Sequence, residues 1–146
     1  MIFGQYIKEF PVFGKMQYRG SWSGQIYLDA FDCTIDVAVS ANKKEGVQPE
    51  QSQAMAGFLS NIAEIKKLAT QPMLDLYVEG AFEIDFAHFD VWQDLHPVQI
   101  EVTNDQYDAQ TGKISLLLIF NSQLEADFCP AIEVIDGAFV QVLSGT

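Results

Sequence analysis

The hydrophobic pattern of this chain changes period twice, and this change limits the folds that the chain can adopt. The three runs between residues 12 and 41 alternate apolar with polar side chains, and in SWSGQIYLDA Trp22, Ile26 and Leu28 share one face. Alternation of this kind is typical of strands in an antiparallel sheet with one buried face. We therefore expect three N-terminal strands joined by tight turns, with Trp22 and Ile26 in the core.

Helical spacing replaces the alternation in the middle of the chain. Pro49 suits the first position of a helix, where its missing N–H costs nothing, and apolar residues recur at helical intervals as far as residue 69. Asn61 and Glu64 match a capping box that would open a second helix. Pro72 should kink or restart that helix, because it cannot donate a backbone hydrogen bond. These signals predict a pair of central helices.

Strand patterns return in the last third of the chain. The runs VQIEVTND and GKISLLLIF are followed by AIEVI and AFVQVL, which flank Asp136-Gly137, a strong hairpin signal. The order of the patterns predicts a single α+β domain over residues 1–146. We expect an antiparallel sheet of about seven strands, three N-terminal and four C-terminal, with the helical pair packed on one face.

The charge of the chain favours some partners and disfavours others. Eight basic and twenty acidic residues give a net charge of −12, which repels phosphate backbones and anionic membranes. No run of about 18 uncharged apolar residues exists to span a bilayer. Charge and proline near the start argue against a signal peptide. We expect a cytoplasmic monomer or homodimer that binds neither nucleic acid nor membrane and whose acidity serves either a basic protein partner or solubility alone.

Common enzyme signatures are missing from the sequence. It contains no glycine-rich nucleotide loop, no GxSxG elbow and no HExxH pair. Cys33 and Cys129 lie far apart among apolar neighbours, so we expect two reduced thiols that pack as small hydrophobic side chains. The sequence predicts no catalytic residues and no cofactor, and therefore a protein that is not an enzyme.

Both histidines lie in one acidic and aromatic stretch, FEIDFAHFDVWQDLHP, at residues 82–97. Carboxylates and imidazoles suit Zn²⁺, Mn²⁺ or Fe²⁺, so the alternative function is a small metal-dependent hydrolase or ligand-binding domain that uses the 83–96 cluster. The pattern favours a solvated connector without metal, because Phe82, Ile84 and Phe86 alternate with the acids and Asp90 can cap a helical turn. The acids that we place in exposed loops or on polar faces are the candidates for contact with a basic partner. They are Glu83, Asp85, Asp90, Asp94, Asp105 and Asp108.

Short motifs over most of the chain carry a family resemblance. They are VFGKMQYRGSWSGQIYL, PEQSQAMAGFLSN and the closing AIEVIDGAFVQV. The residues that match an FG…Y…W.G opening and an EQ…A…FL helix are Phe13, Gly14, Tyr18, Trp22, Gly24, Glu50, Gln51, Ala54, Phe58 and Leu59. With these motifs the chain resembles an uncharacterised bacterial domain family of unknown function.

Some members of that family lie near polymorphic toxins and are suspected immunity proteins. The resemblance implies an immunity-type role and supplies no catalytic residues. Compact size, strong acidity and the lack of a catalytic constellation predict a non-enzymatic protein-binding module of the bacterial cytosol. The segment QLEADFCPA departs from the family pattern, so no site is implied there.

Overall fold

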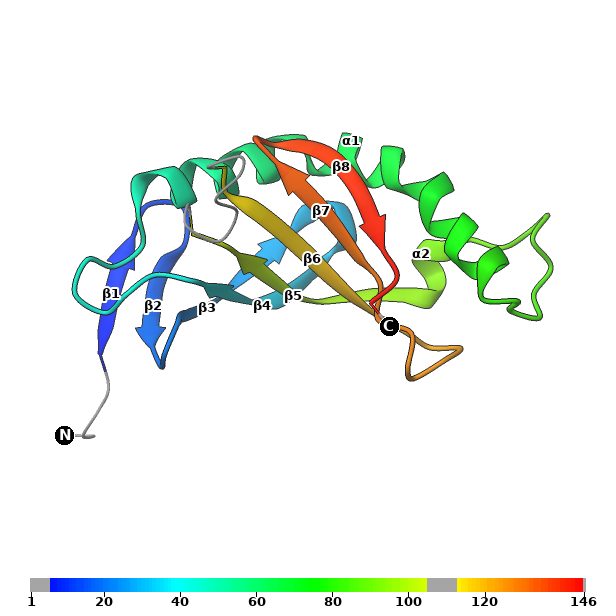
Figure 1. The fold of residues 1–146 in the computed structure, drawn as a ribbon, viewed down its shortest axis with the longest axis horizontal. Coiled ribbons are helices and arrows are strands. Elements are labelled where there is room, and N and C mark those ends of the chain that lie inside the picture. Colours follow the sequence, from blue (N-terminus) through cyan, green and yellow to red (C-terminus); the bar gives the residue numbers. More distant parts are fainter. Residues whose placement is uncertain (1–5, 105–112, 146) are drawn as a thin grey trace.

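The eight strands of the described residues form a single sheet (Figure 1). The computed structural model describes residues 6–104 and 113–145. The N-terminal strands are β1 (Ile7–Phe10), β2 (Gly14–Tyr18), β3 (Trp22–Leu28) and β4 (Cys33–Val39). The C-terminal strands are β5 (Leu95–Val102), β6 (Ser115–Ser122), β7 (Ala131–Ile135) and β8 (Ala138–Leu143). A short 3₁₀ turn, η1 (Asp29–Phe31), joins β3 to β4.

The strands lie in the sheet in chain order, β1 to β8. The sheet differs from the sequence prediction in two ways. The sheet has eight strands instead of seven, because β1 also pairs with β2, from Ile7 opposite Gln17 to Phe10 opposite Gly14. The sheet is mostly antiparallel, but β4 and β5 are parallel, with Val39 opposite Val102. Parallel neighbours need a long crossover, and here it contains the main helix. An α+β architecture is confirmed.

The main helix, α1 (Pro49–Glu79), is continuous, so the prediction of a helical pair is wrong. Pro49 does occupy the first turn. The side-chain amide of Asn61, which we expected to cap a second helix, instead donates to the Gly137 carbonyl at 2.9 Å. Pro72 lies inside the helix. The buried stripe continues past it through Met73 and Tyr77, and this packing outweighs the lost backbone hydrogen bond.

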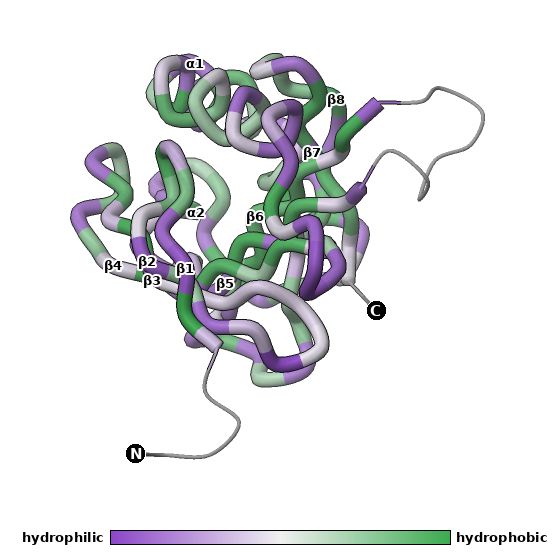
Figure 2. The backbone as a smooth tube through the Cα atoms, turned by 90° about the vertical axis from the view of Figure 1, so that its left-hand side faces the viewer, coloured by the Kyte–Doolittle hydropathy of each residue, from purple (hydrophilic) through white to green (hydrophobic). Residues whose placement is uncertain are grey.

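The core lies between α1 and one face of the sheet. Seen end-on, α1 runs along the curved sheet, with β7 and β8 beside it (Figure 2). Trp22 is fully buried, as predicted, and the rings of Tyr6, Phe10 and Tyr18 surround it at centroid distances of 4.9 to 5.7 Å. Ile26 is half-buried and packs against this core. None of the described helices is long and apolar enough to cross a lipid bilayer.

The helix touches the β7–β8 hairpin at a glycine pair. Asp136 and Gly137 both have positive φ, 54° and 74°, which confirms the predicted tight turn. A Cβ atom added to Gly57 of α1 would lie 3.3 Å from the Cα of Gly137, and one added to Gly137 would lie 3.1 Å from the Gly57 carbonyl group. The absence of side chains at both positions therefore allows the two backbones to approach each other.

One buried amide joins the start of α1 to the parallel strands. Gln51 is fully buried, and its Nε2 donates to the carbonyls of Ser40 at 2.8 Å and Thr103 at 2.9 Å, just beyond the ends of β4 and β5. Its Oε1 accepts from the backbone N–H of Gln48 at 2.9 Å. The side chain thus fixes the N-terminus of α1 against the place where the two halves of the sheet meet.

Candidate functional site

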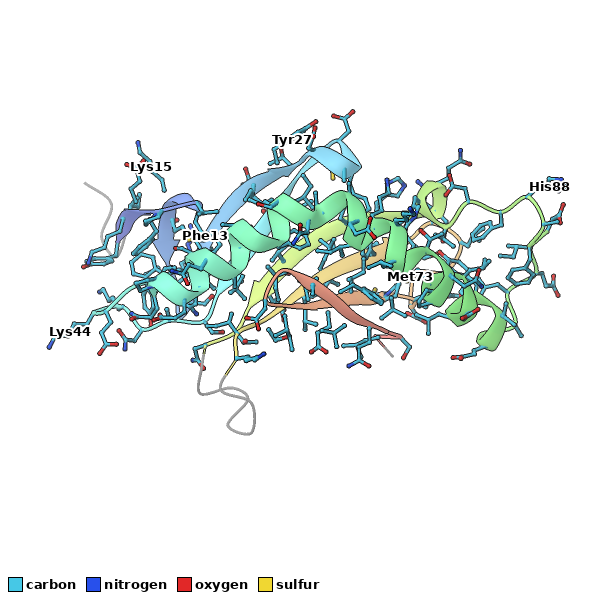
Figure 3. The ribbon with its side chains drawn as sticks, turned by 90° about the horizontal axis from the view of Figure 1, so that it is seen from above. Phe13, Lys15, Tyr27, Lys44, Met73 and His88 are labelled. Carbon is cyan, nitrogen blue, oxygen red and sulfur yellow. The ribbon has the colours of Figure 1, made fainter. Side chains whose placement is uncertain are left out.

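The acidic and aromatic stretch connects α1 to β5 and lies at one end of the molecule. After a connector at residues 80–90, Asp90 caps α2 (Val91–Asp94) as predicted, because its carboxylate accepts from the Trp92 backbone N–H at 3.0 Å. The Trp92 indole donates to Thr70 Oγ1 at 3.0 Å, which ties this turn to α1. Viewed from above, His88 lies at this end, whereas Lys15 and Lys44 lie at the other (Figure 3).

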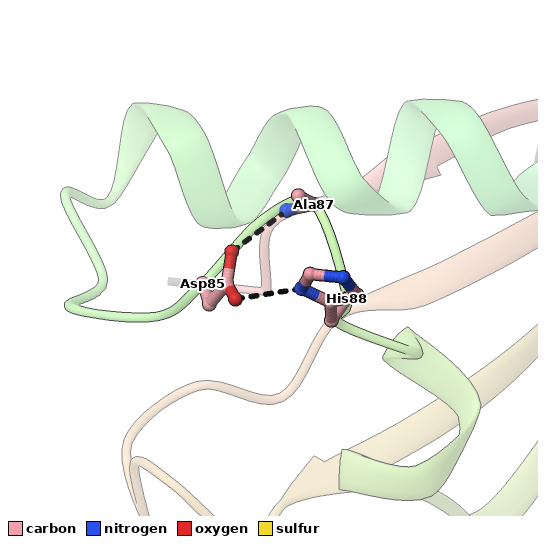
Figure 4. A network of polar contacts seen from close by, with 3 residues as sticks. All are labelled: Asp85, Ala87 and His88. Atoms are coloured by element: carbon pink, nitrogen blue, oxygen red, sulfur yellow. Dashed lines mark hydrogen bonds and ion pairs between the residues drawn. The ribbon is translucent and has the colours of Figure 1, made fainter.

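The two histidines of the stretch have different partners. His88 Nδ1 lies 2.8 Å from Asp85 Oδ2, and Asp85 Oδ1 accepts from the Ala87 backbone N–H at 3.2 Å (Figure 4). His96, on β5, instead contacts the side-chain amide of Gln123 at 2.6 Å. No group of three His, Cys, Asp or Glu side chains in the described ranges could hold a metal ion. The 83–96 stretch therefore does not bring its polar side chains together as one set of ligands.

Asp94 corrects the sequence analysis, which placed its carboxylate in water. Asp94 is only 5% exposed. Its Oδ2 accepts from Tyr77 and Ser122, both at 2.6 Å, and its Oδ1 accepts from the backbone N–H groups of Gln123 and Leu124, both at 2.9 Å. Because α2 is a single turn that leads directly into β5, Asp94 faces the end of α1 and the segment after β6. Burial, followed by the hydrogen bond to Asp94, raises the pKa of the Tyr77 hydroxyl.

The other candidate acids divide into two groups. Glu83, Asp85 and Asp90 are exposed, as predicted, whereas Asp105 and Asp108 lie outside the described residues. The structure adds three exposed acids that the sequence analysis did not select, Glu79 on the last turn of α1 and Glu125 and Asp127 after β6. We define the acidic end as Glu79, Glu83, Asp85, Asp90, Glu125 and Asp127. In the described part of the chain, no lysine or arginine forms a salt bridge with any of these six.

Charge is unevenly distributed between the two halves of the chain. Residues 1–67 contain seven basic and seven acidic residues, whereas residues 68–146 contain one basic and thirteen acidic residues. The whole net charge thus belongs to the second half of the chain. Helix α1 adds to this separation, because the negative end of its dipole lies at Glu79 and no basic residue occupies the last turn.

Two neighbouring hollows indent the surface at the acidic end. The first, of about 440 Å³, is lined by Gly80, Ala81, Phe82, Glu83, Ile84, Leu124 and Glu125. The second, of about 380 Å³, is lined by Leu76, Glu79, Gly80, Phe82, Glu125, Asp127, Phe128 and Ser144. Gly80, Phe82 and Glu125 line both hollows, and the Phe82 ring packs on Tyr77 at 4.8 Å and on Phe128 at 5.2 Å between centroids. The site therefore combines carboxylates with apolar walls.

No arrangement among the described residues indicates catalysis. Cys33 and Cys129 are free thiols, and both are half-buried. Burial raises the pKa of the Cys33 thiol, which disfavours the nucleophilic thiolate.

Comparison with known proteins gives a family without an assigned activity. No curated protein and no solved structure matches the chain significantly. A family model does match residues 12–118, which include β2 to β5, α1, the 80–90 connector and α2, and end within β6. The family is described as a domain of unknown function, so it adds no catalytic or binding residues to those identified from the geometry. The chain belongs to the DUF6985 family.

Proposed function

We propose that this protein is a non-enzymatic protein-binding module that binds a basic partner through its acidic end. The separation of charge is the observation that carries the proposal: four exposed carboxylates of the acidic end line the two hollows, and seven of the eight basic residues belong to the first 67 residues. Proteins commonly use such complementary charge to orient a partner before contact. The family resemblance supports an immunity-type role in the bacterial cytosol.

Charge at one end predicts fast, oriented association. A field of one sign can raise association rates by about 10- to 1,000-fold, and the gain falls steeply as salt screens it. The C-terminal end of α1 strengthens this field at the position of Glu79. A basic partner would therefore meet this end of the molecule first. Solubility alone, the competing explanation for the charge, requires no particular place for the acids.

Two variants of equal charge separate these explanations. The first converts Glu83, Asp85, Glu125 and Asp127 to their amides. The second, a matched control, converts the exposed acids Glu9, Asp29, Glu45 and Glu64 to theirs. Each variant removes four negative charges. Partners captured from the native cytosol by the wild-type protein are then tested for association rate at low and high salt.

We expect the first variant to slow association at low salt by at least about tenfold and the control by less than about threefold. Equal slowing by both variants would mean that only net charge matters. A partner whose association is indifferent to salt and to both variants would contradict the proposal.

A further inference from the structure

The second hollow has a composition that specifies one kind of side chain. Leu76, Phe82 and Phe128 form apolar walls, and the rings of Phe82 and Phe128 lie 5.2 Å apart. Three acids, Glu79, Glu125 and Asp127, line the same hollow, and all three are exposed. An apolar wall beside several carboxylates suits a ligand with an apolar stem and a positively charged head.

The three carboxylates have no cationic partner within the described residues. The salt bridges there involve Asp85 and Asp136 and none of these three acids. The side chain of Glu125 makes a local contact, since its Oε1 accepts from the Asp127 backbone N–H at 3.5 Å. Glu79 also lies in the last turn of α1, where its charge adds to the negative end of the helix dipole. A positive head group would offset both sources of negative potential at once.

We propose that this hollow holds the side chain of a single arginine from the partner protein. The three methylenes of arginine would lie along Leu76, Phe82 and Phe128. The guanidinium would pair with Glu79, Glu125 and Asp127 and contact the aromatic faces. Arginine fits this combination better than lysine, because its planar head forms paired hydrogen bonds to carboxylates, stacks on rings and is less strongly hydrated. A volume of about 380 Å³ leaves room for the side chain and a few waters.

The inference rests on the proposed function and names the residue of the partner that would bind at this end. Arginine is enriched among the residues that dominate binding energy at interfaces. A short arginine segment tests the inference without knowledge of the partner. The probe is the peptide acetyl-Gly-Ser-Arg-Ser-Gly-amide, titrated into the full nitrogen-15-labelled chain and followed by amide chemical shifts. Three matched peptides replace the arginine by lysine, by citrulline, which keeps the shape without the charge, or by norleucine, which keeps only an apolar stem.

We expect saturable shifts at residues 76–84 and 124–128. Binding should be weaker by several-fold for the lysine peptide and by at least about tenfold for the citrulline and norleucine peptides. Glu79→Gln and Asp127→Asn should each weaken arginine binding by about 3- to 10-fold. Glu64→Gln, which changes an exposed acid elsewhere on α1, should not alter it.

Three outcomes would overturn the inference: no saturable shifts at millimolar peptide, citrulline or norleucine binding as tightly as arginine, or lysine and arginine binding equally with shifts spread over all exposed acids. The proposed function fails separately. Association of a captured partner could depend on the acidic end but on none of the partner's own arginines. That result would contradict the arginine inference and would leave the proposed binding function standing.

Discussion

Asp94 is a buried acid whose role is structural. Four donors, from Tyr77, Ser122, Gln123 and Leu124, converge on its carboxylate. Asp94→Ala should lower the free energy of unfolding by about 3–5 kcal/mol, because it leaves several of these donors without a partner. Asp94→Asn should cost less, about 1–2 kcal/mol, because the two hydroxyls can turn to accept from the new amide.

Urea denaturation measures these losses. Asp85→Ala is the control, and it should stay within about 0.5 kcal/mol of wild type because Asp85 is exposed. An Asp94→Ala protein within about 1 kcal/mol of wild type would show that the network contributes little to stability.

Tyr77 makes part of this stability dependent on alkaline pH. Its pKa is raised in the folded state, so the folded protein keeps a proton that the unfolded chain releases above about pH 10. The contribution of the Tyr77 hydroxyl is fully present below pH 10 and is lost as the pH rises towards the higher folded pKa. At pH 7, Tyr77→Phe should be less stable than wild type by about 1 kcal/mol, and this gap should narrow by about pH 11. Denaturation at both pH values measures the gap; a constant gap would contradict the assignment.

The helix and strand predictions that were correct depend on residues close together in the sequence. The Asp136-Gly137 turn, the Asp90 cap and the alternation around Trp22 are set by residues close in sequence, and the sequence predicted all three. Strand β1 gave no signal, because three of its four residues are exposed and it is identified by its pairing with β2.

The errors in the helices and in the site have one physical cause. The Asn61 side chain binds the β7–β8 hairpin, and packing on both sides of Pro72 keeps it within the helix. Asp94 accepts hydrogen bonds from donors almost thirty residues away in the sequence. The second hollow likewise joins residues 76–82 to residues 125–128 and 144. Contacts between residues so far apart in the chain produce no periodic pattern in the sequence. The excess of acids in residues 68–146 was readable from the sequence, and six of these acids form the acidic end.

The contact of α1 with the β7–β8 hairpin predicts an unusual response to alanine. Replacing a helical glycine by alanine normally stabilises a helix by about 1 kcal/mol. Gly57→Ala should instead destabilise the protein by about 1 kcal/mol, because the new Cβ would press on the Gly137 backbone at 3.3 Å. Ser60→Ala, at an exposed position one turn later, is the matched control and should be neutral or slightly stabilising. A gain in thermal stability for Gly57→Ala would show that the hairpin yields without cost.

The distribution of charge over the whole molecule carries a cost in stability. The acids of the acidic end repel one another, and screening by salt relieves this repulsion. Raising NaCl from about 20 mM to about 500 mM should therefore increase the free energy of unfolding by about 0.5–1 kcal/mol. The Glu83, Asp85, Glu125 and Asp127 amide variant should lose most of this salt dependence, and the control variant should keep it. Urea melts at both salt concentrations provide the comparison; a decrease in stability with salt would be the opposite result.

The parallel pairing of β4 with β5 has a consequence for how the chain folds. Strands β1 to β4, and again β5 to β8, are joined to their neighbours as successive antiparallel pairs, so each group can form from contacts between near neighbours. The β4–β5 pair must instead close the segment from residue 40 to residue 94, at a larger entropic cost. We expect two early kinetic units and a late, rate-limiting closure in which α1 docks and Gln51 reaches both halves. Pulse-labelled hydrogen exchange during refolding should then protect the β3–β4 and β6–β7 amides before those of the β4–β5 junction.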